Sequence, residues 1–141
     1  MSEHVDIVEA AGAAEPVGAY PHARRAGDLL FLSGIGPRVR GERSIPGVVL
    51  DAQGRVVDYD IAAQCHAVMR NVRAVLDAAG SSWDRLVDIT VFLTDIERDF
   101  DTYNRVYAEY FPGPVRPCRT TVEVRRLPTP IAIELKCVAT I

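Results

Sequence analysis

The chain is organised around the segment PCRTTVEVRRLP, residues 117–128, whose composition predicts a β-strand bounded by prolines. Because side chains alternate between the two faces of a strand, Arg119 and Thr121 share one face and Cys118 lies on the other. An arginine at the start of such a strand is either a surface residue in a salt bridge or a bidentate partner for a carboxylate. Cys118 is predicted to be a buried, inert thiol.

The composition is typical of a globular protein with a single domain, residues 1–141. The formal net charge is −3 and the sequence has no long basic run, so a nucleic-acid partner is not expected. The apolar stretches are too short to span a membrane, and the polar start MSEHVD is not a secretory signal. The three cysteines are widely spaced and suit reduced thiols, so we expect a cytoplasmic protein.

Apolar alternation and breaker residues predict further strands at residues 5–9, 23–26, 29–32, 48–50, 55–57, 86–94 and 131–140. Residues 29–32 are apolar on both faces, which predicts a buried strand. Helical spacing predicts one helix from an N-cap at Asp60 to Gly80, and a second helix capped by Asp99. This order indicates an α+β two-layer sandwich, with two helices on one face of a mixed β-sheet.

The helices can cover only one face of such a sheet. The other face is predicted to carry Thr90, Phe92, Arg119 and Val138, a mixture that is neither fully polar nor fully apolar. Such a face is usually buried against another subunit, so we expect a homo-oligomer.

Glu134 is the polar residue whose position is most unusual, because it lies inside the last predicted strand. A buried carboxylate is costly unless it is paired. Glu134 either pairs with Lys136 or an arginine, or acts as a general base whose pKa is raised by partial burial. The histidines have no metal-ligand spacing, so no metal site is expected. Simple packing or solvation also explains the remaining polar candidates, which are Tyr20, Asn104, Arg38, Arg40 and Arg43.

From Gly18 to Ala139 the chain resembles the Rid family, the reactive intermediate (enamine/imine) deaminases. The resemblance rests on the order and spacing of VGAYPHA (17–23), FLSG (31–34), NV (71–72), AAG (78–80), TVFLTD (90–95), DF (99–100), Asn104, YF (110–111), PCRT (117–120), LP (127–128) and IE (133–134). It implies a chorismate-mutase-like α+β fold and a homotrimer with three sites between subunits.

The resemblance also implies roles for individual residues. Arg119 would bind the substrate carboxylate, and Glu134 would position the attacking water. Tyr20, Ser33 and Asn104 would line the same cleft. Thr121 stands where the family often has a cysteine. No metal or organic cofactor is expected, because a protonated imine is already electrophilic and needs only positioning and proton transfer.

The loop at residues 36–47 is longer and more basic than in a generic Rid protein, and it looks like the 2-aminomuconate deaminase branch. This implies conversion of a dicarboxylate enamine/imine to 2-oxo-hexenedioate and ammonia in bacterial aromatic catabolism. A loop arginine, such as Arg38 or Arg40, would then hold the second carboxylate. Two alternatives remain, namely a general 2-imino-acid deaminase and a non-catalytic trimer that binds a small ligand.

Overall fold

The structure is a computed structural model, and it describes residues 6–141. Its elements, in chain order, are β1 (Ile7–Val8), β2 (Ala23–Ala26), β3 (Leu29–Leu32), β4 (Val48–Leu50), β5 (Val56–Tyr59), α1 (Ile61–Ala78), the 3-10 helix η2 (Trp83–Arg85), β6 (Leu86–Leu93), α2 (Ile96–Tyr110), β7 (Cys118–Glu123) and β8 (Ile133–Thr140). Neither α1 nor α2 is long and apolar enough to cross a membrane.

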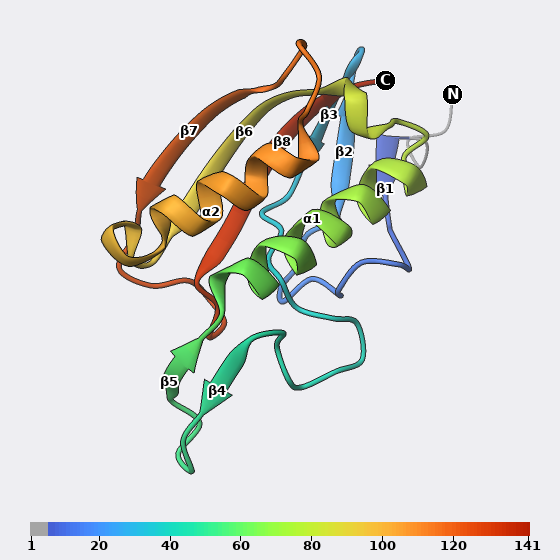
Figure 1. The fold of residues 1–141 in the computed structure, drawn as a ribbon. Coiled ribbons are helices and arrows are strands. Elements are labelled where there is room, and N and C mark those ends of the chain that lie inside the picture. The colour runs from blue at the N-terminus through green and yellow to red at the C-terminus, as the bar shows by residue number, and fades with distance from the viewer. Residues whose placement is uncertain (1–5) are drawn as a thin grey trace.

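Six strands form one sheet in the order β1-β2-β3-β8-β6-β7, and α1 and α2 pack side by side on one of its faces (Figure 1). Among the described strands, only β6 and β7 are parallel neighbours, because α2 carries the chain back across the sheet between them. The other neighbours are antiparallel. The predicted α+β sandwich with a mixed sheet is therefore confirmed.

The core lies between the sheet and the two helices. In β8, Ile133, Leu135 and Cys137 point to the helices and are fully buried, whereas Glu134 and Lys136 alternate with them and are half-buried on the other face. This alternation confirms the sequence pattern. It also places the chemistry-bearing residues of β8 on the face that no helix covers, which we call the open face.

Helix α1 begins and ends where the sequence predicts. The Asp60 side chain accepts a hydrogen bond from the Ala63 N–H, as an N-cap does. Gly80, with φ of 77°, follows the helix in the left-handed conformation that glycine tolerates.

The predicted cap of α2 is wrong. Helix α2 begins one turn earlier, after Asp95, whose side chain accepts from the Arg98 N–H at 3.0 Å. Asp99 lies inside the helix and is 1% exposed. Its carboxylate accepts a hydrogen bond from the Tyr59 hydroxyl, a partner 40 residues away that no local pattern reveals.

Several strand predictions also need correction. Strand β7 ends at Glu123 rather than continuing to residue 128, and β1 is shorter than the predicted 5–9, of which Val5 lies outside the described residues. Strand β3 is not buried on both faces. Leu29 and Phe31 are 38% and 40% exposed, because they point to the open face.

The two faces of β7 are opposite to those expected. Arg119 pairs in register with Ile89, which is fully buried under the helices, so Arg119 lies on the helix side of the sheet and not on the open face. Cys118 lies on the open face and is exposed, so the predicted buried thiol is wrong. The alternation of side chains along β7 defines two faces of the strand. Which of these faces α2 covers depends on the path of the helix and cannot be predicted from the alternation.

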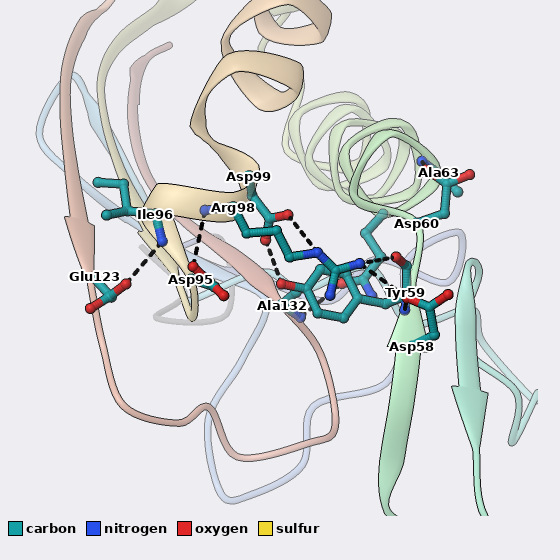
Figure 2. Close-up of polar contacts among 11 residues, drawn as sticks. Asp58, Tyr59, Asp60, Ala63, Asp95, Ile96, Arg98, Asp99, Glu123 and Ala132 are labelled. Carbon is teal, nitrogen blue, oxygen red and sulfur yellow. Dashed lines mark hydrogen bonds and ion pairs between the residues drawn. The ribbon is translucent and has the colours of Figure 1, made fainter.

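Strands β4 and β5 form a separate hairpin that projects beyond the N-terminus of α1 (Figure 1). Tyr59 fastens it to α2, as Figure 2 shows. The Tyr59 hydroxyl donates to Asp99 at 2.5 Å, and Arg98 lies over the Tyr59 ring at 3.9 Å while it pairs with Asp58 at 3.1 Å. Burial, followed by the interaction with Asp99, raises the pKa of Tyr59 to about 12.

Candidate functional site

Glu134 lies on the open face of β8, directly against the turn that follows β3. A methyl group placed on Gly34 would lie only 2.8 Å from Glu134 Oε2, so a glycine is needed there for the carboxylate to fit. Burial raises the pKa of the Glu134 carboxyl above its ordinary value. Glu134 is therefore a carboxylate whose proton affinity is increased by its position.

The carboxylate of Glu134 has no counter-ion among residues 6–141. The Lys136 ammonium donates instead to the Leu32 carbonyl. The interpretation in which Glu134 pairs with Lys136 or an arginine of its own chain is therefore excluded for the described residues. An unpaired, half-buried carboxylate is one arrangement that suits a general base.

Tyr20 lies in the loop before β2, and Ser33 directly follows β3. Together with Gly34 and Arg38 they line a small crevice of about 30 Å³. The Ser33 hydroxyl donates to the Pro21 carbonyl at 2.7 Å, and the Tyr20 hydroxyl accepts from the Val17 N–H at 3.1 Å. Glu134 adjoins this crevice at Gly34, and we call Tyr20, Ser33, Arg38 and Glu134 together the carboxylate half-site.

The two loop arginines that were predicted to bind substrate both hold the segment at residues 10–15. Arg38 donates to the Glu15 carbonyl and lies 3.8 Å from the Glu15 carboxylate. Arg40 donates to the carbonyls of Ala13 and Ala10 at 2.7 and 3.2 Å and also pairs with Glu15, at 3.7 Å. Arg38 borders the crevice, whereas Arg40 does not.

His22 supports the same segment and was not predicted to matter. It is 3% exposed. Its Nδ1 accepts from the Ala10 N–H at 3.0 Å, and its Nε2 donates to the Ala14 carbonyl at 2.8 Å. Its position one residue after Pro21, within the motif VGAYPHA, is the signal in the sequence that could have identified it.

Arg119, Asn104 and Thr121 form a second group, which we call the arginine half-site. The Arg119 guanidinium lies 4.7 Å from the centre of the Tyr107 ring and 5.2 Å from that of Tyr103, both within the range of cation–π attraction. Asn104 and Arg119 line one groove of about 380 Å³. No carboxylate of the described chain pairs with Arg119, so its donors remain available to a ligand.

The tyrosines beneath Arg119 are the functional residues that sequence reasoning missed. Tyr103 is fully buried and its hydroxyl shares a hydrogen bond of 2.8 Å with the Thr121 hydroxyl. The Tyr107 hydroxyl is buried without a partner among the described residues, and burial raises the pKa of Tyr107. Their spacing of four residues predicts a packed aromatic stripe, but nothing local shows that the stripe supports an arginine.

The two half-sites lie on opposite faces of the sheet. Arg119 pairs with Ile89 on the helix side, whereas Glu134 pairs with Phe92 on the open face. The structure thus places Tyr20, Ser33 and Arg38 around one crevice, which Glu134 adjoins at Gly34, and it separately groups Asn104, Arg119 and Thr121. A single copy of the chain cannot present both charged groups to one small ligand.

One further groove, of about 370 Å³, lies beside the Tyr59–Asp99 pair and contains none of the predicted site residues. It is bordered by Gln64, whose carbonyl oxygen accepts from the Ala132 N–H at 2.8 Å. Within residues 6–141, no three histidine, cysteine, aspartate or glutamate side chains are grouped to hold a metal ion. His4, one of the histidines considered above, lies outside this range.

Similar proteins are known. The model of the family described as Endoribonuclease L-PSP matches residues 11–141. A RutC family protein of Pyrococcus horikoshii is 37% identical over 134 residues, covering 95% of this chain and 96% of that protein. Reactive Intermediate Deaminase A of Arabidopsis thaliana, a chloroplastic protein, is 33% identical over 136 residues, covering 96% of this chain and 66% of that protein. The crystal structure of E. coli TdcF with bound serine has a TM-score of 0.82 and 31% identity, covering 96% of this chain and 98% of TdcF.

Proposed function

The chain belongs to the Endoribonuclease L-PSP family and is homologous to RutC and Rid proteins, and from this premise we propose that it is a deaminase that hydrolyses 2-imino acids. One observation carries the proposal. Glu134 is a half-buried carboxylate with a raised pKa and no counter-ion among the described residues, held against Gly34 on the open face. Such a group takes a proton from water and returns it.

The proposed active site forms between two copies of the chain. Arg119 of one copy supplies the carboxylate anchor, and Glu134 of its neighbour supplies the base. Because the two residues lie on opposite faces of one sheet, a closed ring of copies joins each half-site to the complementary one. A homotrimer, as the resemblance to Rid proteins implies, has three such junctions. The exposed Leu29 and Phe31 are the kind of apolar surface that a neighbouring copy would cover.

In this site, Arg119 would bind the carboxylate next to the imine with two parallel hydrogen bonds. Glu134 would accept a proton from water while the water oxygen forms a bond to the imine carbon, and the electron pair of the C=N bond moves to nitrogen. Starting from the protonated imine, Glu134 would return this proton to the nitrogen and then accept the hydroxyl proton as the C–N bond breaks and the carbonyl forms. Ammonia would leave and take that proton from Glu134 as ammonium, which restores the carboxylate. The products are a 2-oxo acid and ammonium, so atoms and charge balance without a cofactor.

Our more specific proposal is that the substrate is 2-aminomuconate and that the chain acts in the bacterial breakdown of aromatic compounds. The length and basic composition of the loop at residues 36–47 support it, because both resemble the 2-aminomuconate deaminase branch. The general 2-imino-acid deaminase remains the broader alternative, and the bound serine of TdcF suits it, since serine also carries a carboxylate beside a nitrogen-bearing carbon. The three free thiols agree with a cytoplasmic setting.

The family description names an endoribonuclease, but no observation on this chain favours RNA cleavage. The net charge is −3, and the loop arginines Arg38 and Arg40 are paired with Glu15. Binding of a polyanion normally requires a basic surface.

The test is direct. The purified protein is given freshly generated 2-iminopropionate and 2-aminomuconate, and ammonia release is compared with spontaneous hydrolysis. Acceleration of both supports the deaminase, and a much larger kcat/KM for 2-aminomuconate supports the specific substrate. Release at the spontaneous rate for both compounds would leave the non-catalytic ligand-binding trimer as the better explanation.

A further inference from the structure

Lys136 places a positive charge beside the proposed base. It follows Glu134 by two residues in β8, so both side chains point to the open face. The Lys136 ammonium donates to the carbonyl of Leu32, the residue that directly precedes Ser33. Lys136 therefore borders the carboxylate half-site, although no part of the proposed mechanism uses it.

Among residues 6–141 the charge of Lys136 has no ionic partner, whereas Arg38 and Arg40 are both paired. A lysine ammonium has three N–H donors, and the structure records one acceptor for Lys136 and no ion pair among residues 6–141. Arg38 and Arg40 share the carboxylate of Glu15 and also donate to backbone carbonyls. Of the cations near Glu134, Lys136 is thus the one with donors to offer a ligand.

The spacing of the two side chains suits a six-carbon dicarboxylate. Two residues along a strand separate Glu134 and Lys136 by about 6.7 Å. An extended carbon chain advances roughly 1.2 Å per bond, so about 5 Å separates the imine carbon from the distal carboxylate carbon, four bonds away, and its oxygens reach further. A substrate with its imine carbon at Glu134 would therefore present its distal carboxylate to Lys136.

We propose that Lys136 is a specificity-determining residue that binds the second carboxylate of a dicarboxylate imine. The inference rests on the proposed deaminase function and assigns the substrate class of that site. Arg119 of a neighbouring copy holds the first carboxylate, Glu134 acts on the imine carbon between them, and Lys136 selects the dicarboxylate over a monocarboxylate.

The experiment compares Lys136→Gln, Lys136→Arg and Arg40→Gln on 2-aminomuconate and 2-iminopropionate. Glutamine keeps a donor for the Leu32 carbonyl but removes the charge. We expect Lys136→Gln to lower kcat/KM for 2-aminomuconate roughly tenfold to a hundredfold, the range for a lost hydrogen bond to a charged group. Its kcat/KM for 2-iminopropionate should stay within about twofold. Lys136→Arg should retain most of the preference, and Arg40→Gln should affect both substrates equally.

Two results would overturn the assignment. An equal loss on both substrates in Lys136→Gln would show that Lys136 supports the fold or Glu134 rather than a carboxylate. A selective loss in Arg40→Gln, with none in Lys136→Gln, would place the second carboxylate at the loop.

A binding measurement separates this inference from the proposed function. Adipate and hexanoate, each titrated calorimetrically into wild type and Lys136→Gln, do not react. If Lys136 binds the second carboxylate, wild type prefers adipate and the variant does not, even if the protein hydrolyses neither imine. An adipate preference that survives in Lys136→Gln would reject the inference while leaving the deaminase untouched.

Discussion

Arg119 and Glu134 lie on opposite faces of the same sheet, in strands that are separated only by β6. The first prediction concerns this relationship. Arg119→Ala and Glu134→Gln should each lose most of the activity alone, yet a mixture refolded or co-expressed in equal amounts should regain much of it. A junction works when one copy supplies Arg119 and the next supplies Glu134, so half times half, or about a quarter, of the junctions are intact.

The control for this mixture is the double variant combined with either single variant, which cannot form an intact junction and should stay inactive. Ammonia release from an imine substrate measures the recovery. If the mixed single variants also stay inactive while they co-assemble, the shared site between copies is wrong.

The second prediction concerns the ionisation of Glu134. As a general base it must be deprotonated, and burial raises its pKa, so kcat should fall as pH decreases through a value above the ordinary glutamate range of about 4.3. Glu134→Gln should lower kcat by roughly a hundredfold to ten-thousandfold with a smaller change in KM. It should also remove this acid limb from the remaining activity. An unchanged kcat would exclude Glu134 from the mechanism.

Glu134 should also lower the free energy of unfolding at neutral pH. Because its pKa is higher in the folded chain than in the unfolded one, the folded chain binds more protons between those two values. The free energy of unfolding therefore falls as pH rises through the folded pKa. Thermal unfolding at fixed protein concentration should show Glu134→Gln to be more stable than wild type near pH 8, with the difference vanishing near pH 4. Equal melting temperatures at both pH values would contradict this.

Tyr59 should matter for the attachment of the β4–β5 hairpin. Tyr59→Phe removes the hydroxyl that donates to the buried Asp99, which keeps only Arg98 at 3.6 Å. The expected cost is about 1–3 kcal/mol in the free energy of unfolding, measured with urea. Tyr110→Phe is the matched control, because its hydroxyl meets His66 in an exposed contact. A similar loss in both variants would mean that burial of Asp99 carries no special cost.

Helix α2 offers a test of its corrected N-terminus. Asp95→Ala should cost about 1 kcal/mol, as loss of an N-cap does, because the Arg98 N–H loses its acceptor. Asp101→Ala, an exposed aspartate within the same helix, should change stability by less than about 0.5 kcal/mol. Chemical denaturation measures the free energy of unfolding of both variants. Equal losses in the two variants would show that Asp95 is not the N-cap of α2.

The fold was predictable where the signals are local. Asp60 begins α1 because its side chain accepts a backbone hydrogen bond, and Gly80 follows its end because glycine tolerates a positive φ. Both properties belong to the residue itself. Asp95 and Asp99 both precede apolar residues at helical spacing, so the sequence cannot tell which of them caps α2. In the structure the Asp99 carboxylate is engaged by the Tyr59 hydroxyl, and that contact depends on where the hairpin lies.

The candidate site was predictable as a set of residues but not as an arrangement. Alternation placed Arg119 and Thr121 together, and the structure agrees. It did not reveal that α2 covers their face, that Tyr107 lies beneath Arg119, or that Glu134 lies against Gly34. Each of these contacts joins segments that are distant in the chain, so each depends on tertiary packing rather than on local propensity.

The separation of the two half-sites has a genetic consequence. A chain that folds and assembles but carries both Arg119→Ala and Glu134→Gln would occupy places in mixed rings without completing any junction. In a cell that makes it alongside an equal amount of normal chain, only about a quarter of junctions would have two sound neighbours, rather than the half expected for independent sites. Such an allele would be dominant-negative, and a truncated chain that cannot assemble would be recessive.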